Sequence, residues 1–156
     1  MQKKFSRLIY FIVCFVFFII CNFYASNRII AYIQSGHAIS NNRVLGLNYV
    51  QNTGAAFSIL QNSTELLIIL SVIALVGIFA YIIKHLKSIS MKSLFCLALL
   101  SAGIAGNMHE RIVFGFVRDY FQLKFVDFPV FNVADIFINV GVILLIIIIL
   151  LKKTRL

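Results

Sequence analysis

The sequence contains little charge and few residues that interrupt a helix. Charged residues make up only 12% of the 156 residues, there is a single proline, Pro129, and there is no tryptophan. Soluble domains carry about 25% charged residues, so this composition excludes an ordinary soluble enzyme and a disordered tail. The three cysteines lie in apolar runs without CxxC or Cys/His spacing, which argues against a zinc site and a disulfide-rich secreted module.

Apolar residues and an excess of positive charge are what the sequence has in abundance. Residues of the set AVILMFWYC make up 62%, and the formal net charge is +9. The basic residues lie at the ends of apolar runs and form no stripe on a soluble face, so we expect no nucleic-acid partner. This composition instead indicates a polytopic membrane protein.

Four continuous apolar runs are long enough to cross a bilayer as helices. They cover residues 8–24, 66–83, 93–111 and 133–151. Even the first run reaches about 25 Å at ~1.5 Å per residue, and runs without alternation favour helices over a barrel. Basic residues precede the first run as in a signal peptide, but no small-x-small site follows it, so we expect it to stay as a helix.

The distribution of charge predicts the orientation in the membrane. The two termini and the segment between the second and third runs lie on one side of the predicted bilayer, and they carry basic residues without acidic ones. The opposite side carries five basic residues and all five carboxylates. The positive-inside rule therefore places both termini in the cytoplasm and the carboxylates at the outer face. The cytoplasmic set comprises Lys3, Lys4, Arg7, Lys84, Lys87, Lys92, Lys152, Lys153 and Arg155.

Two outer segments are too rich in apolar residues to be simple linkers. Residues 27–61 place β-prone positions around Gly54, which predicts strands and a tight turn lying on the membrane. Residues 112–131 contain six Phe and one Tyr, a density that suits the headgroup layer. The predicted fold class is an all-α integral membrane protein, a single domain over residues 1–156, with four transmembrane helices, a small extracytoplasmic β-like segment and an interfacial aromatic loop.

Asp119 and Asp135 are the candidate catalytic residues. Asp135 lies about 4–5 Å inside the last helix, where an ionisable side chain costs on the order of 2–3 kcal/mol and is usually kept for function or offset by a partner. Asp119 lies in a segment that returns toward that helix, so both carboxylates are expected at one depth. Two adjacent carboxylates share a proton and can act as general base and general acid.

Other readings of the polar residues stay open at this point. Either aspartate alone can be a helix N-cap or a salt-bridged acid, while Asp127 and Glu65 look like solvated loop acids. No Ser–His or Cys–His pair is a convincing alternative to the two aspartates. Ser58 lies among apolar residues, and no histidine near it has a neighbouring side chain that would orient its ring as a base.

Further polar side chains line up on the third predicted helix. Gly103, Asn107 and Arg111 recur every four residues and share one face. The guanidinium of Arg111 can hold a carboxylate or a substrate carbonyl, or it can snorkel to the interface.

A second polar stripe lies on the fourth predicted helix. It contains Asn132, Asp135 and Asn139. Asn139 is expected about a turn deeper than Asp135, either as a partner of that carboxylate or in a hydrogen bond between helices.

These residues fall in four motifs, and the motifs carry a family resemblance. They are residues 52–57 (NTGAAF), 106–111 (GNMHER), 115–121 (GFVRDYF) and 131–135 (FNVAD). In this order on four spans, over about residues 8–151, they resemble the lipoprotein signal peptidases (signal peptidase II). The resemblance implies a bacterial membrane aspartic endopeptidase that cuts diacylglyceryl-modified prolipoproteins just before the lipidated cysteine. It implies no metal and no organic cofactor.

The resemblance also implies which residues form the site. The catalytic pair falls on Asp119 and Asp135. It implies an active site near the extracytoplasmic face of the cytoplasmic (inner) membrane, in contact with membrane lipids, and we expect a monomer. The implied substrate-binding residues are Asn52, Gly54, Asn107, Arg111 and Asn132.

Three departures from the family pattern mark this chain as a divergent member. Glu110 stands where the family usually has Asp, and Arg118 stands where an apolar residue is usual. The first helix of the family usually carries an Asp and, a turn later, a Lys, but residues 22–27 read NFYASN here. A polar pair is thus missing or shifted. None of these changes touches the two aspartates, so they predict altered local packing rather than lost activity.

Two rival functions follow from the same residues. A small proton-coupled transporter can use Asp135 as its intramembrane acid, and it would tolerate changes at Asp119. A structural adaptor can pair helices through a face containing Ala102 and Gly106, and it would need neither aspartate. The shallow position of Asp135 and the lack of a mid-span charge argue against the transporter.

Overall fold

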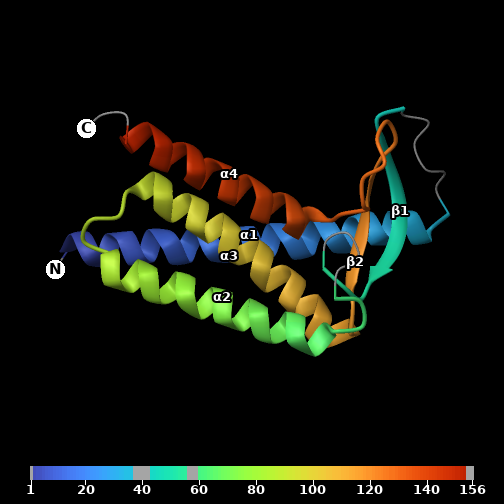
Figure 1. The fold of residues 1–156 in the computed structure, drawn as a ribbon, viewed down its shortest axis with the longest axis horizontal. Helices are drawn as coiled ribbons and strands as arrows, with labels where there is room; N and C mark the ends of the chain where they lie inside the picture. Colours follow the sequence, from blue (N-terminus) through green and yellow to red (C-terminus); the bar gives the residue numbers. More distant parts are fainter. Residues whose placement is uncertain (1, 37–42, 56–59, 154–156) are drawn as a thin grey trace.

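The computed structural model describes residues 2–36, 43–55 and 60–153, which form four long helices and a two-stranded sheet at one end (Figure 1). All four helices are long and apolar enough to cross a membrane, and each predicted apolar run lies within one of them. Ala56, Phe57, Ser58 and Arg155 lie outside the described residues. In chain order the elements are α1 (Gln2–Gln34), β1 (Leu45–Asn52), α2 (Thr64–His85), α3 (Met91–Phe114), β2 (Val117–Leu123) and α4 (Val133–Lys153).

The helix α3 lies at the centre of the bundle and packs against the other three helices. In its membrane-spanning stretch 56% of residues are buried, against 11% in each of the others. Small residues let α4 approach closely. A methyl group on Gly103 would lie 2.5 Å from the carbonyl oxygen of Ala134, and one on Gly141 would lie 3.0 Å from that of Cys96. Such contacts are typical of helix pairs in lipid.

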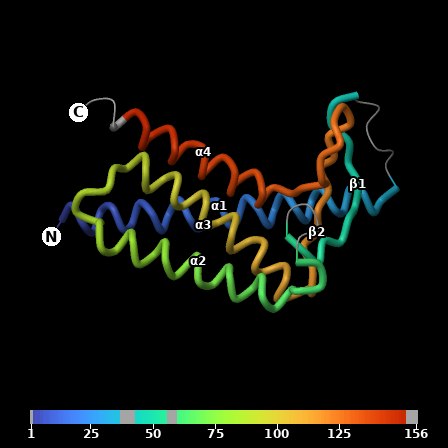
Figure 2. Tube along the Cα trace, viewed as in Figure 1, coloured from blue at the N-terminus to red at the C-terminus, as the bar shows by residue number. Residues whose placement is uncertain are grey.

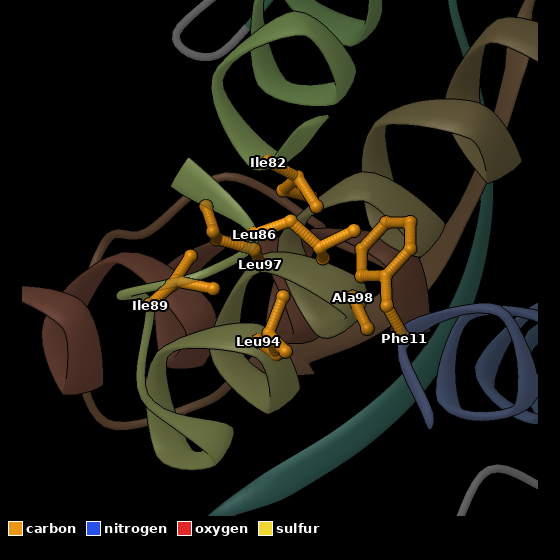
Figure 3. Close-up of a cluster of buried hydrophobic side chains, with 7 residues drawn as sticks. All are labelled: Phe11, Ile82, Leu86, Ile89, Leu94, Leu97 and Ala98. Atoms are coloured by element: carbon orange, nitrogen blue, oxygen red, sulfur yellow. The ribbon is translucent and has the colours of Figure 1, made fainter. Parts of the chain in front are cut away.

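An apolar cluster stabilises the end of the bundle far from the sheet (Figure 3). It joins α1, α2, the α2–α3 connection and α3. The Arg7 guanidinium fastens the same end, because it donates to the main-chain carbonyls of Leu86, at 3.1 Å, and Lys87. The cluster consists of Phe11, Ile82, Leu86, Ile89, Leu94, Leu97 and Ala98.

The first helix is longer than its apolar run predicts. It has 33 residues, about 50 Å at ~1.5 Å per residue, and it continues behind the sheet in Figures 1 and 2. The prediction of strands was wrong for residues 27–34, which are helical. The physical reason is that Asn22, Ser26 and Ile30, spaced by four, are all buried, so one helix face keeps packing beyond the apolar run.

The two strands come from the two outer segments that the sequence analysis treated separately. The strand β1 pairs antiparallel with β2, so the segment predicted as an aromatic loop supplies half of the sheet (Figure 2). Val50 lies opposite Asp119 and Asn52 opposite Val117, with an irregularity between Leu47 and Val50. Asn52 is two residues along β1 from the partner of Asp119, so the two side chains share one face of the sheet and meet diagonally.

Two further connections place β2 beside the start of α4. Gly115 ends α3 in a left-handed conformation, with φ of 82°, and this lets the chain turn into β2. The N–H of Phe131 donates to the carbonyl oxygen of Phe121 at 3.0 Å, and the reverse bond measures 2.8 Å. The segment before α4 is therefore fixed to β2.

The close contact of α3 and α4 can be tested with two glycines. We expect Gly103→Ala to lower the melting temperature in detergent by roughly 5 °C, because the added methyl group meets a main-chain oxygen. Gly77→Ala in α2 is the matched control, since nothing lies within 4 Å of a Cβ there. Melting followed by intrinsic tyrosine fluorescence measures both, and equal melting temperatures for the two variants would contradict the tight contact.

Candidate active site

The carboxylate of Asp119 is buried in β2 and bound by two amides. Only 2% of the residue is exposed. The side-chain amide of Asn52 donates to Oδ2 at 2.9 Å, and that of Asn132 donates to Oδ1 at 2.8 Å. Both partners are neutral, so they stabilise the carboxylate without adding a formal positive charge.

Asp135 belongs to a capping arrangement at the start of α4. The Asp135 N–H donates to Asn132 Oδ1 at 2.9 Å, and the Asn132 N–H donates to Asp135 Oδ2 at 3.0 Å. This reciprocal pair is a capping box, which satisfies main-chain donors at the helix start. The N-cap residue of this box is Asn132, and Asp135 is the third residue of the helix, so the alternative of Asp135 as the N-cap itself was wrong. Its other oxygen, Oδ1, accepts a bond of 2.8 Å from the amide of Asn107.

One continuous run of hydrogen bonds connects the two aspartates. The Asn132 amide donates both to Asp119 and to Asn107 Oδ1, the latter at 3.0 Å, and the amide of Asn107 donates to Asp135. β1, β2, α3 and the start of α4 all supply members. Five of the seven predicted site residues lie in this network: Asn52, Asn107, Asp119, Asn132 and Asp135.

The other two predicted residues, Arg111 and Gly54, contact each other beside the network. Arg111 Nη2 donates to the main-chain carbonyl of Gly54 at 2.7 Å, and the N–H of Gly54 donates to Asn52 Oδ1 at 2.9 Å. Arg111 is only 9% exposed, so it does not snorkel to the interface. Its Nε is buried without a hydrogen-bond partner among the described residues. That donor is available to a bound ligand.

A buried tyrosine supports the network from behind. Tyr120 is fully buried, and its hydroxyl lies 2.8 Å from Ser26 Oγ of α1. The N–H of Val133 donates to the same hydroxyl at 3.2 Å. The Tyr120 hydroxyl therefore joins α1, β2 and the start of α4.

Both aspartates line a cavity of about 980 Å³. One part of its wall is polar and includes the network and Arg111. The opposite part is apolar and comes from α2 and α4, with Leu67, Leu70, Ile136 and Val140 among its residues. An open cavity that combines a polar end with an apolar wall suits an amphipathic ligand.

Burial, and next the negative charge of Asp135, raise the pKa of Asp119 to about 7, although the hydrogen bonds from Asn52 and Asn132 oppose this. A carboxylate with such a pKa exchanges its proton near neutral pH. The pair therefore has the protonation behaviour that acid–base chemistry needs. Among the described residues, no group of three or more His, Cys, Asp or Glu side chains is placed to hold a metal ion.

Two details differ from the sequence predictions. Asn139 donates to the main-chain oxygen of Asp135, at 2.9 Å, and the Asp135 carboxylate is bound instead by Asn107 and the Asn132 N–H. An ion pair of 2.7 Å between Glu110 and Arg118 was not predicted from the sequence. Their opposite charges on the two sides of the turn at Gly115 were the available signal.

Comparison with known proteins identifies a family that matches most of the chain. The family model described as Signal peptidase (SPase) II matches residues 10–151. A lipoprotein signal peptidase of Streptococcus thermophilus (strain CNRZ 1066) is 44% identical over 105 residues, which cover 67% of this chain and 68% of the relative. One of Latilactobacillus sakei subsp. sakei (strain 23K) is 42% identical over 110 residues, covering 70% and 72%.

Solved structures give the same result for the fold. A bacterial membrane enzyme solved by the in meso method at 2.3 Å resolution is similar with a TM-score of 0.75 and 30% identity, covering 92% of this chain and 88% of that one. A second, at 1.9 Å, has a TM-score of 0.69 and 28% identity, covering 90% and 92%. With a family model that matches most of its length and relatives above 40% identity, the chain belongs to the signal peptidase II family.

Proposed function

We propose that Asp119 and Asp135 form the catalytic pair of a membrane aspartic endopeptidase that removes signal peptides from diacylglyceryl-modified prolipoproteins, cutting before the lipidated cysteine. Membership of the signal peptidase II family supports the activity and the substrate class. The observation that carries the residue assignment is the single network of amides that binds both carboxylates at one cavity.

In the proposed reaction the pair shares one proton. The ionised carboxylate takes a proton from a water molecule held between the two side chains, and the water oxygen attacks the scissile carbonyl carbon. The protonated carboxyl gives its proton to the carbonyl oxygen, so a tetrahedral diol forms. The carbon–nitrogen bond then breaks as the carboxyl that took the water proton passes it to the amine, and one diol hydroxyl returns its proton to the other carboxylate. The raised pKa of Asp119 supports this protonation state near neutral pH.

The rest of the cavity fits the two halves of the proposed substrate. The extended peptide is held by Asn52, Gly54, Asn107, Arg111 and Asn132. The Nε of Arg111, which has no hydrogen-bond partner in the described part of the chain, is a donor for a peptide carbonyl. The apolar wall from α2 and α4 supports binding of the acyl chains from the lipid side.

The distribution of charge supports an active site at the extracytoplasmic face. The start of α1, the end of α4 and the α2–α3 connection lie at one end of the bundle, and the sheet lies at the other (Figure 1). Basic residues gather at the first end, and Asp119 and Asp135 lie at the second. By the positive-inside rule the termini are cytoplasmic.

Neither rival function gains support. The family comparison favours the peptidase over a transporter that uses Asp135. The small-residue face proposed for an adaptor packs inside the chain, since Ala102 is fully buried and Gly106 lies against Asn22 and Ala134.

Replacing either aspartate by asparagine tests the catalytic pair. We expect Asp119→Asn and Asp135→Asn each to lower cleavage by about 100- to 10,000-fold, because each removes one proton carrier. The measurement is the mobility of a diacylglyceryl-modified prolipoprotein on a gel after incubation with the purified enzyme. Asp127→Asn, at an exposed loop acid, is the matched control. Wild-type processing by either dyad variant would refute the assignment.

Replacing Arg111 by lysine tests the guanidinium. We expect Arg111→Lys to lower kcat/KM about tenfold, because one ammonium group cannot bind the Gly54 carbonyl and also supply the donor now carried by Nε. Arg43→Lys, at an exposed position, is the control and should leave kcat/KM unchanged. Equal kcat/KM values for Arg111→Lys and wild type would contradict this role of the guanidinium, because they would show that a positive charge at residue 111 is enough for activity.

The raised pKa of Asp119 also predicts how stability depends on pH. A free Asp has a pKa of about 3.9, so the folded protein binds this proton more tightly than the unfolded chain does. The stabilisation is complete below about pH 4 and is lost as pH rises toward 7. Asp119→Asn lacks this proton, so its stability relative to wild type should rise between pH 5 and pH 8. We expect the rise in relative free energy of unfolding to be roughly 2–3 kcal/mol, which corresponds to several degrees in melting temperature. A difference independent of pH would contradict a raised pKa.

A further inference from the structure

The ion pair between Glu110 and Arg118 holds both the main chain and the side chain of the residue before Asp119. The N–H of Arg118 donates to Glu110 Oε2 at 2.7 Å. The Arg118 guanidinium donates to Oε1 through Nε at 3.1 Å and Nη2 at 2.7 Å. A carboxylate bound in this way by three donors fixes the backbone at the start of β2.

The surroundings keep the pair in one geometry. The side chains of Arg118 and Glu110 are 14% and 5% exposed. The guanidinium carbon lies 4.4 Å from the centre of the Phe114 ring, and Nη2 contacts Asn27 Oδ1 of α1 at 3.3 Å. Glu110 is one turn from the end of α3, so the pair spans the Gly115 turn and joins the most buried helix to the strand that carries Asp119.

We propose that Glu110 and Arg118 are positioning residues for catalysis: their ion pair sets the place of Asp119 and keeps the charge beside it balanced. The proposal rests on the proposed function, because it presumes that Asp119 is catalytic. Neither side chain lines the cavity, so neither binds the peptide directly. The effect is transmitted through one peptide unit, from residue 118 to residue 119.

Charge balance distinguishes this role from simple stabilisation of the turn. The ionisable groups that act on Asp119 are Asp135 from α4 and Arg111 and Glu110 from α3, with Arg118 its neighbour in β2. β1 contributes the neutral amide of Asn52. If Glu110 is neutralised, the Arg118 cation remains and favours the ionised form of Asp119. If Arg118 is neutralised, the Glu110 anion remains and disfavours it.

The experiment compares Glu110→Gln, Arg118→Gln and the double variant as purified full-length enzyme acting on a diacylglyceryl-modified prolipoprotein. We expect each single variant to lower kcat about tenfold, with KM changed less than about twofold. The pH–kcat profile of Glu110→Gln should move to lower pH and that of Arg118→Gln to higher pH, each by about 0.5. The double variant should lose no more activity than the worse single variant and keep a profile near that of wild type.

Conservative and matched variants keep the test decisive. Arg118→Lys retains the charge and the main-chain bond, so its pH profile should stay in place even if kcat falls. Glu65→Gln and Arg28→Gln make the same chemical changes at exposed positions and should behave as wild type. If Glu110→Gln does not fold, the comparison of Arg118→Gln with Arg118→Lys decides.

The outcomes separate this proposal from the proposed function. Profiles that do not move, profiles that move in the same direction, or losses that add in the double variant would overturn the positioning role. If those results appear while Asp119→Asn and Asp135→Asn remain inactive, only the positioning role fails. If Asp119→Asn cleaves the substrate, the catalytic assignment fails instead.

Discussion

The burial of two carboxylates beside each other is the constraint on which this structure depends. Each interacts unfavourably with the other, and their strongest partners are neutral amides rather than cations. A cation bonded directly to both would favour ionisation of the pair and leave no proton to share. Arg111 is close enough to act on both aspartates through its charge, but within the described residues its hydrogen bond goes to the carbonyl oxygen of Gly54. The amides therefore fix the geometry while the proton stays exchangeable.

Holding that arrangement requires contacts between segments far apart in the sequence. The close packing of Gly103 against Ala134 sets the height of α4 on α3, and so brings Asn107 to Asp135. The pairing of Phe121 with Phe131 fixes the start of α4 to β2. Strand pairing then brings in Asn52 from β1. The site is thus assembled at the one end of the bundle where helices, strands and their connections meet (Figure 1).

The sequence predicted the elements whose signal is local. Continuous apolar runs identified all four helices, and an acid near the start of such a run identified Asp135. Pairing between distant segments leaves no hydropathy signal, so neither the partner of β1 nor the route of the aromatic segment into β2 was predicted. The last turns of α1 were missed because residues 25–34 are too polar for an apolar run, and their helical face is apparent only from the burial of Ser26 and Ile30.

The departures from the family pattern have a common physical explanation once the contacts are known. Glu110 and Arg118 each depart from the family pattern, but they form an ion pair with each other, so the charge of the acid is balanced by that of the base. On α1 the region 22–27, which departs from the family pattern, contains Asn22 and Ser26, and both are buried and neutral. Ser26 contacts Tyr120, and Asn27 contacts Arg118. Helix α1 is therefore joined to β2 by one neutral contact and by one contact from the Arg118 cation. A charged side chain in place of the buried Asn22 or Ser26 would need an opposite charge beside it, because an unpaired buried charge is strongly destabilising.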